Sequence, residues 1–192
     1  MRVAVLVSGK GSNLQRIFQA IEQGELSDLC VSHVIADRDC TVLEHGLDRD
    51  VPTFSLERSP YLSKEIDEIL TGEADLIVLA GFLSILEGYF CRKWHEKLIN
   101  IHPSLLPQYG GEGMYGMRVH RAVLKNREKV SGATTHYVIP EVDSGEIILQ
   151  KSCSISSDES PESLAKKVRS VEHEILIETI RKLSADFLAS RI

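Results

Sequence analysis

The feature that most constrains the fold is an alternation of short apolar runs with amphipathic segments along the first hundred residues. The expected strands are residues 2–7, 30–37, 74–82 and 99–102. The expected helices, identified by apolar side chains at helical spacing, are residues 13–24, 61–70 and 91–98. Strands that are apolar on both faces and alternate with helices predict a parallel sheet covered by helices on both sides.

The pattern changes after about residue 130. Residues 132–139 and 146–155 are adjacent strand-like runs joined by the turn sequence PEVDSG, which predicts an antiparallel addition. Ser160 and Pro161 then predict the start of a long amphipathic helix. Its expected buried stripe is Leu164, Val168, Val171, Ile175 and Leu176. The predicted fold class is therefore α/β: a mostly parallel twisted sheet with helices on both faces, a Rossmann-like N-terminal half, an antiparallel addition and a long C-terminal helix.

Composition and charge narrow the class of protein. A chain of 192 residues with 43% hydrophobic residues predicts one domain, and a formal charge of -6 argues against a surface that coats nucleic acid. The run after Met1 is too short for a secretory leader or a membrane span, which predicts a cytoplasmic chain. Four cysteines without a C-x-x-C pair predict reduced thiols and no metal site. They are Cys30, Cys40, Cys91 and Cys153.

The first strand ends in the loop SGKGSN, which leads directly into a helix. The backbone N–H groups of Gly11, Ser12 and Asn13 would then point outward at a helix N-terminus, where anions bind. The loop does not match the P-loop motif G-x-x-x-x-G-K-[ST]. It also fails the dinucleotide fingerprint, because Leu14 stands at the position of the third glycine. It therefore predicts a site for a phosphate monoester, with a plain glycine-containing turn as the alternative.

A second motif, NIHPSLLP, places Asn100 and His102 at the end of an apolar strand. Residues two apart on a strand face the same side, and Pro103 favours extended backbone at His102, so the two side chains are expected to face one space. Ile101 would point into the core. The alternative is a strand that simply ends in solvent.

Asp143, in the turn after the antiparallel strand, is the expected partner of His102. A carboxylate there would orient the imidazole and raise its pKa, although Asp before Ser-Gly is also an ordinary turn residue. No serine or cysteine is placed as a nucleophile, so a direct transfer is expected. Asn100 and protonated His102 would then bind an oxyanion, where one donor typically contributes ~3 kcal/mol.

Other segments would complete a pocket. Leu83, Ser84, Ile85 and Leu86 follow a buried strand and would line an apolar slot, with core packing as the alternative for the aliphatic side chains. His120 and His136 are expected in the pocket wall. His120 begins the helical sequence HRAVLKN, so a helix cap or a solvent contact is the alternative for it. The glycine-rich loop at residues 108–120 is expected to be a mobile lid or a flexible surface loop.

Five motifs in order resemble the phosphoribosylglycinamide formyltransferase family. They are VLVSGKGSNLQ, VLAGFLSIL, LINIHPSLLP, THYVIPEVDSGEIILQ and VRSVEH. The resemblance covers nearly the whole chain. It implies transfer of a formyl group from the co-substrate 10-formyltetrahydrofolate to the amine of glycinamide ribonucleotide in de novo purine biosynthesis.

The resemblance also implies residue roles. The catalytic residues would be Asn100, His102 and Asp143. The substrate-binding residues would be Gly11, Ser12, Asn13, Arg169 and Glu172, although Arg169 stands where the family often has glutamine. The folate-binding residues would be Arg58, Leu83, Ser84, Ile85, Leu86, Asn100, Ile139, Pro140, Glu141, Val142 and Asp143.

The expected domain spans residues 1–192, with residues 1–100 as the half that binds the nucleotide phosphate and residues 101–192 as the half that binds folate and catalyses. One alternative is a 10-formyltetrahydrofolate hydrolase, and another is a non-catalytic folate- or nucleotide-binding module. The extra domains typical of the hydrolase and of methionyl-tRNA formyltransferase do not fit in this length. No nucleic-acid or membrane partner is expected, and the sequence leaves a homodimer open.

Overall fold

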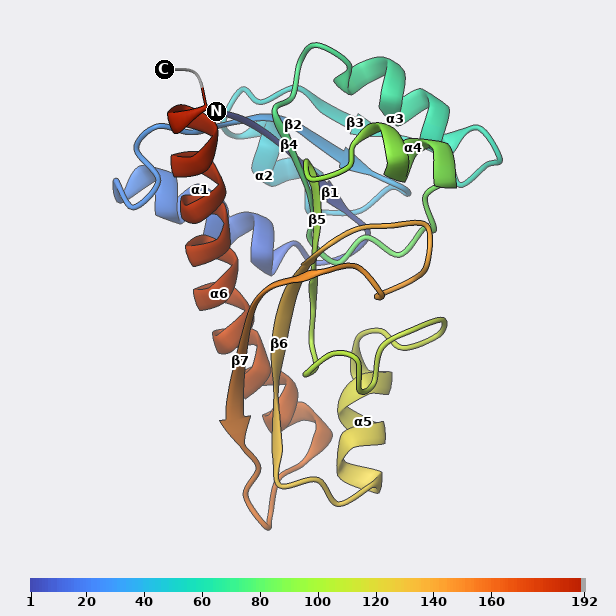
Figure 1. The fold of residues 1–192 in the computed structure, drawn as a ribbon, viewed down its shortest axis with the longest axis vertical. Coiled ribbons are helices and arrows are strands. Elements are labelled where there is room, and N and C mark those ends of the chain that lie inside the picture. Colours follow the sequence, from blue (N-terminus) through green and yellow to red (C-terminus); the bar gives the residue numbers. More distant parts are fainter. Residues whose placement is uncertain (191–192) are drawn as a thin grey trace.

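A seven-stranded sheet forms the centre of the computed structural model, which describes residues 1–190 (Figure 1). The strands are β1 (Arg2–Val7), β2 (Cys30–Ala36), β3 (Thr53–Ser55), β4 (Leu76–Leu79), β5 (Leu98–His102), β6 (Val130–Tyr137) and β7 (Ile147–Ser154). Their order is β3-β2-β1-β4-β5-β6-β7. The first five strands are parallel, whereas β6 and β7 are antiparallel, which confirms the predicted fold class. The last two residues of the expected domain lie outside the described part.

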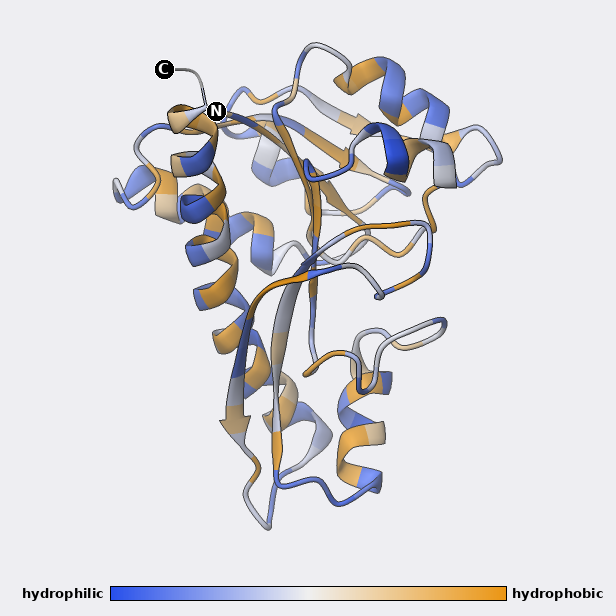
Figure 2. Cartoon of the chain, in the orientation of Figure 1, coloured by the Kyte–Doolittle hydropathy of each residue, from blue (hydrophilic) through white to orange (hydrophobic). Residues whose placement is uncertain are grey.

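Six helices cover the described sheet on both faces. They are α1 (Ser12–Glu22), α2 (Leu43–Leu47), α3 (Leu62–Leu70), α4 (Gly88–Lys93), α5 (Met117–Lys125) and α6 (Pro161–Ala189). Val3, Val5 and Val7 of β1 pack in the core formed with α1, α2, α5 and α6, whereas Ala4 and Leu6 pack with α3 and α4. Figure 2 shows the same division, because the central strands are mostly hydrophobic and the helices carry both colours. Both faces of the sheet are therefore covered, as predicted.

The long C-terminal helix begins where the sequence predicts. Ser160 is the N-cap, and its hydroxyl accepts a hydrogen bond from the Ser163 N–H while the Ser163 hydroxyl accepts one from the Ser160 N–H. All five residues of the predicted stripe are buried. Although α6 has 29 residues, no helix among residues 1–190 is long and apolar enough to cross a membrane.

Three elements differ from the sequence prediction. The helix expected over residues 91–98 is α4, Gly88–Lys93, because Glu96 has a left-handed φ of 61° that a helix cannot continue through. The elements α2 and β3 were not predicted, since five and three residues are too few to show a periodic pattern.

The strand order creates a crevice at one edge of the sheet. The chain leaves β1 toward β2 on one side and later returns to β4 on the other, so β1 and β4 are the switch point of the topology. Ligands in open α/β sheets bind outside the carboxyl ends of the strands at such a point. The loops after β1, β4 and β5 all reach this crevice.

We expect Ser160→Ala to lower the free energy of unfolding by about 1 kcal/mol, because the N-cap hydroxyl satisfies an otherwise unpaired helix N–H. Urea unfolding followed by circular dichroism measures the change. Ser170→Ala, on the exposed side of the same helix, is the matched control and is expected to stay within about 0.5 kcal/mol of the wild type. Equal effects of the two substitutions would contradict the role of the cap.

Candidate active site

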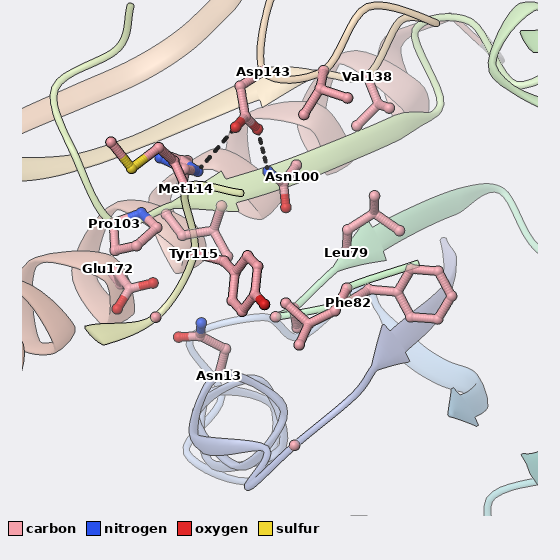
Figure 3. Close-up of a pocket in the computed structure, with 18 of the residues that line it drawn as sticks. Asn13, Leu79, Phe82, Asn100, Pro103, Met114, Tyr115, Val138, Asp143 and Glu172 are labelled. Atoms are coloured by element: carbon pink, nitrogen blue, oxygen red, sulfur yellow. Dashed lines mark hydrogen bonds and ion pairs between the residues drawn. The ribbon is translucent and has the colours of Figure 1, made fainter. Parts of the chain in front are cut away.

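A cavity of about 780 Å³ lies in the crevice at the carboxyl ends of the strands (Figure 3). It brings together most of the residues that the sequence singled out. Those that line it are Gly11, Ser12, Asn13, Leu83, Ser84, Ile85, Leu86, Asn100, His102, His120, His136, Ile139, Pro140, Val142, Asp143, Arg169 and Glu172. Arg58 and Glu141 are not among the lining residues.

One end of the cavity is formed by the N-terminus of α1. Gly11 precedes the helix with a φ of 71°, and a Cβ there would lie 1.8 Å from Cγ2 of Val42, so the close approach of α2 requires glycine. No side chain among residues 1–190 forms a capping hydrogen bond at the N-terminus of α1. Its first N–H groups therefore remain available to an anion in the cavity.

Helix α6 brings Arg169 and Glu172 to the same end of the cavity, and Figure 3 shows Glu172 across the cleft from Asn13. Burial raises the pKa of Glu172 to about 7, although a hydrogen bond from Asn13 and the charge of Arg169 act in the opposite direction. The carboxyl group can therefore be either protonated or charged near neutral pH, and it can donate or accept a hydrogen bond.

His120 lies between this end and the centre of the cavity. It is the fourth residue of α5 and only 5% exposed, so it is neither a helix cap nor a solvent contact. Burial, together with the charges of Arg169 and His102, lowers the pKa of His120 to about 4. Its Nδ1 has no hydrogen-bond partner among the described residues. The ring is therefore a neutral, unsatisfied polar group in the cavity wall.

The centre of the cavity holds the three residues expected to converge. His102 is 4% exposed and Ile101 packs in the core, so the strand does not simply end in solvent. Asp143 approaches both polar side chains of β5. Its Oδ2 lies 3.4 Å from Nδ1 of His102, and its Oδ1 lies 3.5 Å from Nδ2 of Asn100.

The side-chain amide of Asn100 has a defined orientation. Nδ1 of His136 donates to the Tyr137 carbonyl at 2.8 Å. Nε2 of His136 lies 3.1 Å from Nδ2 of Asn100 and 3.6 Å from Oδ1 of Asp143, so it accepts from Asn100 when the ring is neutral and donates to Asp143 when the ring is charged. The second N–H faces Asp143, and the amide oxygen points into the cleft (Figure 3). When the His136 ring is neutral, both N–H groups of Asn100 are thus engaged. Donation to an oxyanion, the expected role, requires the longer contact with Asp143 to give way.

Burial opposes charge on the central pair. It lowers the pKa of His102 below its ordinary value, although Asp143 and the Tyr109 carbonyl act to raise it. Asp143 thus acts on His102 in the expected direction, but its effect is smaller than that of burial. Burial would also raise the pKa of Asp143, yet the hydrogen bond from His136, the charge of His102 and the Gly111 N–H together hold it below its ordinary value. The Asp143 carboxylate is therefore charged, and it lies beside the His102 ring, whose pKa is lowered.

Backbone groups of the glycine-rich loop complete the centre of the cavity. The Tyr109 carbonyl accepts from Nε2 of His102 at 2.8 Å, and the Gly111 N–H donates to Oδ2 of Asp143 at 3.0 Å. The sequence analysis missed both contacts. The glycines at positions 110 and 111 were the available signal, because a Cβ at Gly110 would lie 2.5 Å from Cδ2 of Leu106.

The other end of the cavity is an apolar slot. Leu79, Phe82 and Val138 face it in Figure 3. Leu86 is only 6% exposed and belongs to the core, as the alternative reading expected, whereas Ile85 is 66% exposed. An exposed aliphatic side chain at the rim of a cavity suits a flat apolar ligand.

Arg58, expected to contact the cofactor, is engaged elsewhere. Its Nη2 lies 2.7 Å from Oδ2 of the buried Asp37, which also accepts hydrogen bonds from Arg38 and from Ser84 at 2.7 Å. Ser84 lines the cavity, so Arg58 reaches the slot only through this network. The sequence did not indicate it because the network depends on a carboxylate buried after β2.

Comparisons with known proteins identify the class. Residues 1–180 match the family described as "Formyl transferase". The chain belongs to the formyl transferase family. Residues 1–190 contain no group of His, Cys, Asp and Glu side chains arranged to hold a metal ion.

Particular relatives are phosphoribosylglycinamide formyltransferases. The chain is 35% identical to the structure of such an enzyme from Anaplasma phagocytophilum, with a TM-score of 0.88 over 97% of this chain and 88% of that one. It is 33% identical to the chloroplastic enzyme of Arabidopsis thaliana, over 93% of this chain and 64% of the plant protein. It thus spans less than two thirds of that relative. A formyltetrahydrofolate deformylase from Pseudomonas syringae is also similar, with 28% identity and a TM-score of 0.85 over 96% of this chain and 61% of that one.

We expect Glu172→Gln to change how stability depends on pH. The pKa of Glu172 rises from 4.5 to about 7 on folding, so across this window the folded chain keeps a proton that the unfolded chain releases. Glu172 therefore destabilises the fold as pH rises through the window. The free energy of unfolding of the variant, relative to the wild type, should increase by at most about 3 kcal/mol from low to neutral pH. Urea unfolding of both proteins at several pH values measures this, and a difference independent of pH would contradict it.

Proposed function

We propose that this chain transfers the formyl group of 10-formyltetrahydrofolate to the amine of glycinamide ribonucleotide. One observation carries the proposal. Asn100, His102 and Asp143 meet in a single cavity, between an uncapped helix N-terminus and an apolar slot. These three parts suit a phosphate, a pterin and a reacting carbonyl carbon placed between them. The names of the similar proteins support the same reaction.

In the proposed reaction the amine attacks the formyl carbon directly. A carbon–nitrogen bond forms, the carbonyl electron pair moves to oxygen, and the intermediate expels the folate N10, which takes up the proton that the amine loses. His102 donates a hydrogen bond to the oxyanion, and Asn100 does so with the N–H that faces Asp143. Asp143 orients the imidazole and favours its charged form.

A covalent enzyme intermediate is not needed in this proposal. Ser104 is fully buried, and its hydroxyl donates to the Gln108 carbonyl at 2.6 Å, so its oxygen has no access to the cavity. Cys91 lines the cavity, but burial raises the pKa of its thiol above the ordinary value. A protonated thiol is a poor nucleophile.

The remaining residues would bind the two substrates. Gly11, Ser12 and Asn13 would hold the phosphate, with Arg169 and Glu172 at the ribose or glycinamide end. The segments 83–86 and 139–143 would enclose the folate, with His120 and His136 in the pocket wall. Both halves of the chain contribute to each substrate in this arrangement. Arg58 would act on the folate only through Asp37 and Ser84.

The decisive experiment supplies purified protein with 10-formyltetrahydrofolate, with and without glycinamide ribonucleotide, and follows the released folate by absorbance. Release that depends on the ribonucleotide, with formation of the formylated product, is expected. Equal release without the ribonucleotide would favour the hydrolase. That activity is the main rival, because the chain is similar to a known deformylase. Binding of either compound without release would favour a non-catalytic binding module.

We expect His102→Ala and Asp143→Ala each to reduce kcat by at least ~100-fold, because each removes a group that stabilises the oxyanion or orients its donor. Ribonucleotide affinity, measured by calorimetry, should change little, since the phosphate end is untouched. His95→Ala, an exposed histidine of the same chain, is the control. Normal turnover in either variant would remove that residue from the mechanism.

We expect Gly11→Ala to raise the KM for the ribonucleotide by about tenfold or more, because a Cβ cannot fit beside Val42 and the helix N–H groups must move from the phosphate. Gly9→Ala is the matched control, since nothing lies within 4 Å of a Cβ there. Steady-state kinetics measures both, after thermal unfolding shows that the variants are folded. Equal KM values for the two variants would argue against phosphate binding at this turn.

A further inference from the structure

Tyr109 is in direct contact with the imidazole of His102 through its backbone. Its carbonyl oxygen lies 2.8 Å from Nε2 of His102. A carbonyl can only accept a hydrogen bond, so Nε2 must carry a proton whenever this contact exists. The position of the Tyr109 carbonyl therefore decides which ring nitrogen of His102 is free to exchange a proton.

The opposite ring nitrogen faces a different kind of acceptor. Nδ1 of His102 lies 3.4 Å from Oδ2 of Asp143. When the ring is charged, Nδ1–H points to the carboxylate. When the ring is neutral, the proton is absent from Nδ1 and the bond to Tyr109 persists. Only Nδ1 changes its protonation between the two states.

The side chain of Tyr109 is held in place by two hydrogen bonds outside the cavity. Its hydroxyl donates to Oε1 of Glu128 at 2.7 Å and accepts from Nδ2 of Asn126 at 2.9 Å. Both partners follow the C-terminus of α5, outside the residues that line the cavity. Burial, together with the adjacent Glu128, raises the pKa of Tyr109 above its ordinary value, so the phenol remains a donor.

The backbone at Tyr109 has a conformation that requires support. Its φ is 56°, in the left-handed region, which a bulky residue rarely adopts and which costs of order 1 to 3 kcal/mol. Two residues later, the Gly111 N–H binds Asp143. The short segment 109–111 thus contacts both members of the His102–Asp143 pair, and the phenol is its side-chain attachment to α5.

We propose that Tyr109 is a positioning residue that holds His102 as the Nε2–H tautomer. Nδ1 is then the nitrogen that donates to the reacting group, once its 3.4 Å contact with the Asp143 carboxylate gives way. The inference rests on the proposed formyl transfer only for its effect on rate. The assignment of the tautomer concerns the protein alone. Loss of the phenol hydroxyl should leave the carbonyl less well placed, since the contacts with Glu128 and Asn126 are gone.

The experiment compares the wild type with Tyr109→Phe. Nitrogen-15 NMR of labelled histidine should show His102 of the wild type as the Nε2–H tautomer in its neutral form. In the variant we expect a detectable fraction of the Nδ1–H tautomer and a lower His102 pKa, because a bond that favours the charged ring is weakened. We expect kcat to fall about tenfold, with the KM for the ribonucleotide within about twofold.

Glu128 provides matched variants at the other end of the hydrogen bond. Glu128→Gln keeps an acceptor for the phenol and should retain the wild-type tautomer and rate. Glu128→Ala should resemble Tyr109→Phe, and the double variant should lose little more than Tyr109→Phe alone, since all three variants remove the hydrogen bond between the phenol and Glu128. Tyr61→Phe, at an exposed tyrosine with 68% exposure, controls for removal of a phenol as such.

The NMR signals of His102 and the value of kcat together distinguish failure of the positioning role from failure of the proposed function. A wild type with the Nδ1–H tautomer, or a Tyr109→Phe variant with unchanged tautomer, pKa and kcat, would overturn the proposal. A fall in kcat without any change in the His102 signals would also overturn the proposal, because the effect of the substitution would then be merely structural. If the wild type showed the expected tautomer but no formyl transfer, the proposed function would fail and the positioning role would stand. If Tyr109→Phe did not fold, Glu128→Ala would provide the same test with the Tyr109 side chain unchanged.

Discussion

The return of the β6–β7 connection over the end of β5 is the constraint on which the candidate site depends. Register pairs Asn100 with His136 and His102 with Thr134, and the chain then turns back so that Asp143 reaches β5. The turn requires Gly145, because a Cβ there would lie 1.8 Å from the Tyr137 carbonyl oxygen. The carboxylate is therefore placed by backbone packing between strands, and a shift of one residue in register would direct these side chains to the other face.

Burial then determines what the polar groups of the cleft can do. It moves the pKa values of unlike groups in opposite directions, with His120 lowered to about 4 and Glu172 raised to about 7. His120 is therefore neutral at physiological pH and Glu172 is divided between its neutral and charged forms, so the neutral forms can make hydrogen bonds to a ligand without the desolvation cost of a full charge. Asp143 is the exception, since three neighbouring groups favour its charge. A negative charge is thus held beside the ring that would meet the reacting carbon.

How much of this could be predicted from the sequence depends on the range of the interaction. The Ser160 cap, the stripe of α6 and the common face of Asn100 and His102 follow from local rules, and the sequence predicted them. The approach of Asp143 is long-range, and it was expected only because an imidazole at that position needs a carboxylate and because the motifs resemble a known family. The engagement of Arg58 by Asp37 was not predictable, since no local pattern indicates which arginine a buried carboxylate will bind.

The backbone contacts of the site were its least predictable part. Nearly every residue has the same carbonyl and N–H groups, so the sequence does not indicate which of them will contact a side chain. Tyr109 and Asp143 both have φ values above 50°, unusual for residues other than glycine, and both contact His102. Neither conformation is favoured locally, so each persists only where surrounding contacts hold it. Those contacts come from α5, β5 and the β6–β7 turn, which meet only in the complete fold. The geometry of His102 is therefore a property of the folded sheet as a whole, which explains why a motif of eight residues can mark the site without specifying its arrangement.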